Sequence, residues 1–240
     1  MPETELKRLS RREALGLFGA ASAALSVGAC SDASPTSPTT TTTTTTGTTT
    51  TPPTSTTTCA VTPTETEGPF PSIALPTRSD VREDRTGLLL NLAITVVNTN
   101  ASCAPVTNAT VEIWHCDARG DYSEYGTQTS ATWLRGVQPV NASGVANFTT
   151  IYPGWYQGRA THIHVEVMVA GRSVKITQIA FPEEINNAVY ASGVYASKGA
   201  NPTKNATDMV FSDGVNSELA TMSGNTGSGY TATFTVGVAV

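Results

Sequence analysis

Charged residues are scarce in this sequence, and basic residues are the scarcer kind. Only 14% of the 240 residues are charged, and 14 Lys and Arg stand against 19 Asp and Glu, a formal net charge of −5. Four of the basic and three of the acidic residues lie before residue 30, which leaves 10 basic and 16 acidic residues in the remainder, a net charge of −6. No basic stripe follows. An acidic body of this kind argues against nucleic acid as a partner.

The apolar stretch at residues 14–29 is too short for a comfortable transmembrane helix, because roughly 16 residues fall below the about 20 that a span needs. It follows a basic segment that contains Ser10-Arg11-Arg12, the pattern of an export signal. The arginine pair resembles a twin-arginine signal, and an ordinary secretory signal is the alternative. Residues 27–30 (VGAC) resemble a lipoprotein cleavage box. We therefore predict an exported, extracytoplasmic protein whose only membrane contact is a lipid anchor on Cys30.

Apolar side chains are almost missing from residues 31–58, which are mainly Thr, Ser and Pro. Such a segment cannot offset the entropy of ordering its backbone, so we predict a disordered tether. The predicted organisation is an export signal at residues 1–30, the tether at 31–58 and one folded domain at 59–240. A domain of this size can bury a sizeable core.

Cysteine is also rare, with four residues in the chain. Cys30 belongs to the signal, and an exported protein permits a disulfide among the other three. We predict a bond between Cys59 and Cys103, because it would fix the start of the domain to a loop that follows the first strand. Cys116 is then the free thiol. The sequence alone leaves the other pairings open.

Helix signals are weak, and short β-prone segments dominate beyond residue 59. Only residues 182–191 suggest a short helix. The strand candidates are residues 88–97, 110–114, 145–151, 162–169, 173–181 and 230–238. Closely spaced short strands predict an all-β fold, a β-sandwich with long loops around its site and little helix.

Histidine is the rarest chemistry-bearing residue, with three in the chain, and two of them form His162-Ile163-His164. Alternate residues of a strand share a face, so the two imidazoles would lie side by side as a metal chelate. Two structural histidines explain the bare pattern equally well. A Pro- and Gly-containing loop with Tyr156 and Arg159 leads into this strand, and Tyr122 lies in a separate Gly-containing turn. The third histidine, His115, is interpreted as structural.

These motifs, in this order and spacing, resemble the intradiol ring-cleavage dioxygenases. The matching stretches are residues 66–70 (TEGPF), 111–123 (VEIWHCDARGDYS), 134–136 (LRG), 150–156 (TIYPGWY), and then Arg159, His162-Ile163-His164 and Thr177-Gln178. The match covers residues 60–190. The family resemblance implies one Fe(III) per chain on a β-sandwich, with the four ligands Tyr122, Tyr156, His162 and His164. It also implies that Arg159 and Gln178 act on the bound substrate.

The resemblance implies a specific reaction as well. A catechol-type aromatic diol and O2 are the substrates, and a cis,cis-muconate-type diacid is the product. Phenolate ligands favour Fe(III) over Fe(II), and the family uses one displaced tyrosinate as a local base, for which Tyr156 is the candidate. Arg159 would stabilise negative charge on the substrate. Which catechol is used, and whether the chain forms a homodimer, do not carry over, because this chain has an export signal and a tether where cytoplasmic members have a helical region.

Two alternatives compete with this interpretation. In the first, His162, His164 and Glu166 form a facial triad for Fe(II) or a zinc site, since the three residues share a strand face. In the second, the domain is an exported β-sandwich that binds a carbohydrate or another ligand, with Trp133 and Trp155 as stacking platforms. The first leaves both tyrosines without a role, and the second leaves the four candidate ligands without one.

Overall fold

The structure, a computed structural model, describes residues 59–240. The predicted export signal, the Cys30 anchor and the tether lie outside these residues. Within the described part of the chain, no helix is both long enough and apolar enough to span a membrane.

Strands dominate the described residues. They are β1 Leu89–Asn98, β2 Ala104–Pro105, β3 Ala109–Trp114, β4 Arg135–Pro139, β5 Val145–Ile151, β6 His162–Val169, β7 Arg172–Ala180, β8 Thr221–Asn225 and β9 Gly229–Val238. The single α-helix here is α1, Glu183–Tyr190, and short 3-10 turns cover Thr99–Ala101, Gly193–Tyr195, Asn205–Thr207 and Val215–Ser217.

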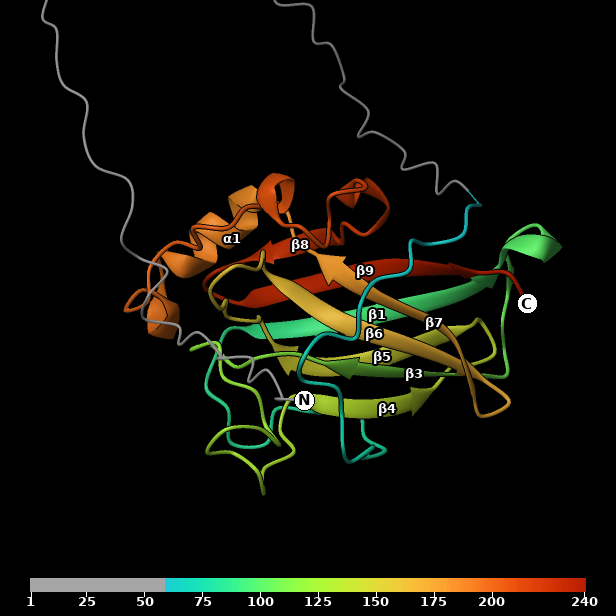
Figure 1. Ribbon diagram of the computed structural model, residues 1–240, viewed down its shortest axis with the longest axis horizontal. Coiled ribbons are helices and arrows are strands. Elements are labelled where there is room, and N and C mark those ends of the chain that lie inside the picture. The colour runs from blue at the N-terminus through green and yellow to red at the C-terminus, as the bar shows by residue number, and fades with distance from the viewer. Residues whose placement is uncertain (1–58) are drawn as a thin grey trace, which may run out of the picture. The chain divides into compact units, whose positions relative to one another are not determined.

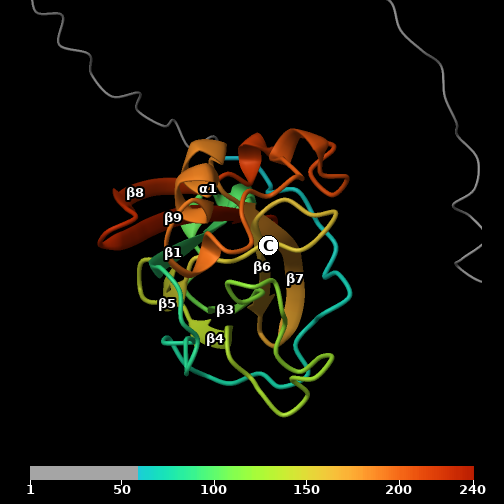
Figure 2. The same ribbon diagram turned by 90° about the vertical axis from the view of Figure 1, so that its left-hand side faces the viewer.

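The strands form two sheets. In one, β1 lies between β9, its parallel neighbour, and β5, its antiparallel neighbour, with β2 also on β1 and β8 on the far edge of β9. In the other, the order is β4-β3-β6-β7 and all pairs are antiparallel. Figures 1 and 2 show the two sheets from the side and from one end. The predicted all-β sandwich is confirmed.

Alternating side chains build the core between the sheets. Leu90, Leu92 and Ile94 of β1 point inward and are fully buried, and they meet Ile163 and Val165 of β6 from the other sheet. Because the side-chain period of a strand is two, the residues between them point outward. This alternation places His162 and His164 on the outer face of their sheet.

The strand predictions for β5 and β6 have the observed bounds. Those for β3 and β9 differ by one residue at one end, and those for β1, β7 and α1 by one residue at each end. Three strands went unpredicted, namely β4, β8 and the two-residue β2. In β4 the sequence RGVQP contains Gly and Pro, and in β8 the sequence TMSGN has no apolar alternation and is largely exposed. Both are edge strands, where pairing does not require two apolar faces.

The predicted disulfide is confirmed. Cys59 and Cys103 are bonded, with Cα atoms 5.6 Å apart, and Cys116 is a buried free thiol. The bond joins the start of the described chain to the loop that follows β1. It therefore anchors the N-terminal end of the segment that lies over the sheet of β6 and β7.

Residues 59–74, here called the N-terminal arm, cover the outer face of the sheet that contains β6 and β7. Seen end-on in Figure 2, the arm lies on the side of these strands that faces away from β1 and β9. Its backbone bonds to β7 through Glu65 N and Ile176 O, 3.0 Å apart, and Lys175 Nζ donates to Thr62 O at 2.7 Å. The loop after β3 closes on the arm, since Tyr125 donates to Pro71 O at 2.7 Å. The outward-facing residues His162, His164 and Gln178 of this sheet are therefore buried.

Candidate active site

Two histidines lie at the centre of the covered face. His162 and His164 are 3% and 1% exposed, and their Nε2 atoms are 3.2 Å apart. The Nδ1 of His162 donates to Ala160 O at 2.7 Å, which leaves the Nε2 lone pair of this ring directed toward His164. Trp114, the β3 partner of His164, stacks on the ring of His164 with centroids 4.8 Å apart. The strand geometry that the sequence predicts for the two imidazoles is present.

Both predicted tyrosines join the histidines. The hydroxyl of Tyr156 lies 3.2 Å from His162 Nε2. The ring of Tyr122 lies 5.8 Å from that of Tyr156 and 6.4 Å from that of His164, and its buried hydroxyl has no hydrogen-bond partner among residues 59–240. A buried phenol without a partner is costly, and a cation at this point would satisfy it.

The loop that carries Tyr122 is held by its own turn. Asp117 accepts from the backbone N–H groups of Arg119 and Asp121 at 2.8 and 3.1 Å, which bends the chain after β3. Gly120 follows with a φ of +92°, and a Cβ there would lie 2.3 Å from Trp155 O. Only glycine fits this approach, which brings the Tyr122 loop against the loop that carries Tyr156.

A buried ion pair fixes the other side of the Tyr122 loop. Arg135, 0% exposed, donates to Ser123 O at 2.8 Å, to Phe70 O at 3.1 Å and toward Glu124 at 3.1 Å. Glu124 in turn accepts from the backbone N–H of Ile73 at 2.7 Å. Arg135 therefore ties the Tyr122 loop to the N-terminal arm, which gives the LRG motif a structural role.

The N-terminal arm also covers the site through Phe70 and Gly68. Phe70 stacks on Tyr122 with centroids 4.6 Å apart and meets the edge of Tyr156 at 6.2 Å. Gly68, at a φ of +71°, lies so close that a Cβ there would be 3.2 Å from Cε1 of His164. Residues 66–70 belong to the stretches that carry the family resemblance, and the structure gives Phe70 and Gly68 definite contacts in the site.

Arg159 and Gln178 lie beside the four candidate ligands and contact each other. Arg159 Nη2 donates to Gln178 Oε1 at 2.6 Å, and Gln178 Nε2 donates to Thr66 O at 2.8 Å. Gln178 pairs with His164 across β6 and β7, so it occupies the same outer face. The predicted substrate residues are therefore brought together with the predicted ligands.

Burial sets the protonation of the site. It lowers the pKa of His162 to about 3, with the charge of Arg159 adding to the effect, and lowers that of His164 well below its usual value. Both imidazoles are therefore neutral at pH 7, the form that binds metal. Burial raises the pKa of Tyr122 and of Tyr156, and Arg159 partly offsets the rise at Tyr156. The phenols keep their protons unless a cation compensates the charge.

This donor set fits Fe(III). Two neutral imidazole nitrogens and two phenol oxygens face one buried space, and loss of the two phenol protons would place two negative charges beside a trivalent ion. Tyr122, with a hydroxyl that nothing in the described chain satisfies, carries this fit.

The His-His-Glu triad is wrong. Residues i and i+4 of a strand are about 13 Å apart along its axis, so His162 and Glu166 share a face without sharing a metal. Within residues 59–240, the one group of three His, Cys, Asp or Glu ligand atoms that lie within 4.8 Å of each other is Glu65, Asp213 and Glu218.

Of the two stacking platforms proposed for a binding module, Trp133 is buried and Trp155 is partly accessible. Trp133 is 2% exposed and lies under Arg85 in the core, and Trp155 is half-buried, with its indole N–H bonded to Gly199 O at 2.9 Å. His115 is structural, as predicted. It is fully buried, and its Nε2 lies 2.7 Å from Thr150 Oγ1.

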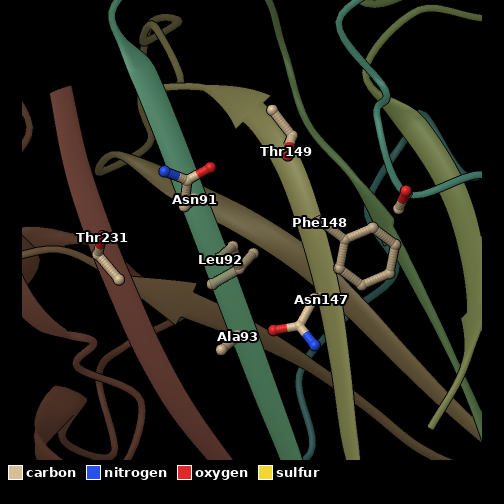
Figure 3. A pocket seen from close by; sticks show the side chains of 8 residues that line it. Asn91, Leu92, Ala93, Asn147, Phe148, Thr149 and Thr231 are labelled. Atoms are coloured by element: carbon tan, nitrogen blue, oxygen red, sulfur yellow. The ribbon is translucent and has the colours of Figure 1, made fainter. Parts of the chain in front are cut away.

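A separate hollow of about 290 Å³ lies on the outer face of the other sheet. It is lined by Ser79, Asn91, Leu92, Ala93, Asn147, Phe148, Thr149 and Thr231 (Figure 3). None of these side chains titrates or binds metal readily. The chemistry of the molecule therefore belongs to the covered face of the β3-β6-β7 sheet.

The fold and the site define a β-sandwich protein with a buried donor set of two tyrosines and two histidines. A family model described as "Dioxygenase" matches residues 75–205, more than half of the chain. The chain belongs to the intradiol ring-cleavage dioxygenase family. A comparison with curated proteins gives no match.

Solved structures agree with this membership. The chain is similar to an intradiol ring-cleavage dioxygenase from Tetranychus urticae, with 27% identity, a TM-score of 0.70, and 75% of this chain and 95% of that chain covered. It is also similar to the dioxygenase domain of a dioxygenase carbohydrate-binding protein fusion from Streptomyces sp. SirexAA-E, at 27% identity, a TM-score of 0.57, and 75% and 99% coverage. Catechol 1,2-dioxygenase from Acinetobacter sp. ADP1 shares the fold at 22% identity and a TM-score of 0.52, with 74% and 62% covered.

Sequence reasoning missed two neighbours of the site. Trp114 becomes visible as a partner of His164 only when the β3–β6 register is known. Asp208, which contacts Arg159, lies in an irregular segment with no motif and beyond the range that the family model matches. No sequence signal marks it.

Proposed function

We propose that this protein is a non-haem Fe(III) intradiol dioxygenase that opens the ring of a catechol-type substrate between its two hydroxyl-bearing carbons. The observation that carries the proposal is the convergence on His162 Nε2, which has the Tyr156 hydroxyl and His164 Nε2 each at 3.2 Å. The unpartnered hydroxyl of Tyr122 completes the donor set. The reaction adds both atoms of O2 to the diol and gives a cis,cis-muconate-type diacid, so it needs no external reductant.

The four side chains Tyr122, Tyr156, His162 and His164 would hold one Fe(III) per chain. When bound, the ion would supply Lewis-acid chemistry that makes a catechol ring reactive toward O2. Tyr156 is the ligand on the more open side, since it is half-buried whereas Tyr122 is buried. With a cation bound, Tyr156 would be a phenolate, and its oxygen is therefore the one placed to take a proton from the entering diol.

The remaining residues act on the substrate. Arg159 keeps its positive charge throughout, and its guanidinium would stabilise negative charge that develops on the ring. Gln178 holds that guanidinium through the 2.6 Å bond to its Oε1, and its own amide is held in turn by Thr66 O at 2.8 Å. Phe70 and Trp114 cover the site with apolar rings, which excludes water and strengthens these electrostatic interactions.

The experiment that tests the function is product identification. Purified, iron-loaded protein is incubated with oxygen and a panel of catechol, hydroxyquinol, protocatechuate and lignin-derived diols, while oxygen uptake is followed. A muconate-type diacid and a visible tyrosinate–iron absorption band support the proposal. A semialdehyde from cleavage outside the diol contradicts it, as does a fully iron-loaded protein that consumes no oxygen with any member of the panel.

We propose as well that the enzyme is exported and lipid-anchored through Cys30, with residues 31–58 as the tether. The support is the basic segment, the short apolar stretch and the VGAC box of the sequence. Cys30→Ala should move the protein from the membrane fraction to the soluble extracytoplasmic fraction. Identical fractionation of the variant and the wild type contradicts the anchor.

A further inference from the structure

Asp208 is a buried carboxylate that no part of the proposed reaction uses. It is 2% exposed and lies in the loop that follows the 3-10 turn Asn205–Thr207. We infer that Asp208 is the positioning residue for Arg159, the arginine proposed to act on the substrate. It holds the side chain of Arg159 and the backbone of Ala160, two residues before His162, in one arrangement. The inference deepens the proposed function and rests on it.

The contacts of Asp208 are complete and specific. Its two oxygens accept from Arg159 Nε at 2.9 and 3.2 Å. Oδ2 also accepts from the backbone N–H of Ala160, and Oδ1 from that of Val210 at 2.8 Å. A buried charge is tolerated when a partner charge and hydrogen bonds satisfy it, and this carboxylate has both.

These bonds fix the direction of the guanidinium. The fork of Arg159 is planar and rigid, its Nε is held by Asp208 and its Nη2 by Gln178. Nη1 has no hydrogen-bond partner among the described residues, so it is the part of the fork left for a ligand. Burial raises the pKa of the Tyr156 hydroxyl, and the charge of Arg159 partly offsets this rise.

Asp208 also reaches the histidine strand. Ala160 donates its backbone N–H to Asp208, and the carbonyl of the same residue accepts from Nδ1 of His162. One carboxylate thus sets the substrate arginine directly and the orientation of one histidine through a single residue. Asp208 touches neither the donor atoms nor the space between them, so it acts through its neighbours.

The kinetic test is a double-mutant cycle of Asp208→Asn and Arg159→Ala in the full, iron-loaded chain. Asp208→Asn should lower kcat and kcat/KM together by about 10–100-fold, while iron content and the visible band stay at wild-type values. In the Arg159→Ala background it should add less than about a twofold loss, because its partner is already gone. Asp213→Asn, with the same charge change at an exposed position of the same segment, is the matched control and should leave kcat unchanged.

Three outcomes overturn the inference. They are a wild-type kcat for Asp208→Asn, an equal fold-loss in both backgrounds, and an equal loss for Asp213→Asn. If Asp208→Asn is unfolded by circular dichroism, Arg159→Lys tests the contact from the other side, because Lys keeps the charge but has no Nε–H. That variant must then lose about 10–100-fold in kcat with iron retained, and a wild-type kcat overturns the inference.

A second readout is independent of turnover. In metal-free protein labelled with ¹⁵N, the Nε–H of Arg159 should exchange slowly with water, and Asp208→Asn should make it exchange fast while Asp213→Asn does not. A fast-exchanging Nε–H in the wild type overturns the inference by itself. If the wild type cleaves no catechol, the proposed function fails, and the exchange measurement still decides whether Asp208 holds Arg159.

Discussion

The two sheets of the sandwich present outer faces that follow the same alternation and have opposite characters. On the sheet of β1, β5 and β9, the outward residues Asn91, Asn147 and Thr231 are exposed and neutral, around the hollow of Figure 3. On the sheet of β3, β6 and β7, the outward residues His164 and Gln178 are buried under the N-terminal arm. Both sheets alternate inward and outward side chains in the same way, but only the sheet of β3, β6 and β7 is covered by the N-terminal arm.

This difference shows where function resides. Polar side chains on an open face keep their water and cost nothing, whereas polar side chains under a cover must be paired inside the protein. The covered face nevertheless keeps an unpartnered Tyr122 hydroxyl and an unpartnered His164 Nδ1. A sequence selected for stability alone would place apolar residues there, so the exception indicates a ligand.

The largest expected effect comes from the covered face. His162→Ala and His164→Ala should each abolish iron binding and activity, because each removes one of the two neutral donors of a four-residue site. Tyr156→Phe should weaken the visible band and slow turnover. Metal analysis and absorption spectra measure these outcomes, with Thr231→Ala on the open face as the control. A His164→Ala protein with full iron content would show that the covered face does not hold the iron through this histidine.

The next effect concerns the cover. Opening the Cys59–Cys103 bond, which closes a segment of 44 residues, should lower the free energy of unfolding by about 3–4 kcal/mol in the chain-entropy model. Cys103→Ser and chemical denaturation measure it. Cys116→Ser, at the buried free thiol, is the comparison that does not open the bond. Equal stability of the Cys103→Ser and wild-type proteins would show that the arm needs no tie.

A smaller effect separates residues that bind iron from residues that act on the substrate. Arg159→Ala should keep the iron and the colour and lower kcat by about 100-fold, because its charge acts on the reacting substrate. Gln178→Ala should behave likewise with a milder loss, since it supports Arg159 through one hydrogen bond. Steady-state kinetics with parallel metal analysis checks both. Loss of iron in Arg159→Ala would place it among the residues that hold the metal.

The edge of the covered sheet gives a pH-dependent effect. Burial and the nearby Glu65 raise the pKa of Glu218 from 4.5 to about 8. The folded state therefore binds this proton more tightly than the unfolded state, and the stabilisation that is full below pH 4.5 is lost as the pH rises toward 8. Glu218→Gln should remove this dependence and raise the free energy of unfolding at pH 8 by on the order of 1–2 kcal/mol. Glu67→Gln, an exposed change, is the control, and a parallel pH curve for Glu218→Gln contradicts the assignment.

The sequence was sufficient for the fold because β1, β5 and β6 carry a clear period of two. It was also sufficient to bring His162 and His164 together, since their spacing needs only local strand geometry. Tyr122 came from the family resemblance, because its place depends on the Asp117 turn and on the Arg135 ion pair, which join segments far apart in the chain. The role of Asp208 could not be predicted for the same reason, because 48 positions separate it from Ala160 in the sequence.

The smallest expected effect lies on the open face, and it is the sharpest control on the comparison. Thr231 lies beside Asn91 across the β1–β9 pair and is exposed, so Thr231→Lys adds a charge that water solvates. The free energy of unfolding should change by less than about 0.5 kcal/mol, and iron content and kcat should not change. Gln178→Lys introduces the same charge at a fully buried position on the covered face and should destabilise the protein by about 3 kcal/mol or more. Equal losses of stability in the two variants would mean that the cover does not account for the difference between the faces.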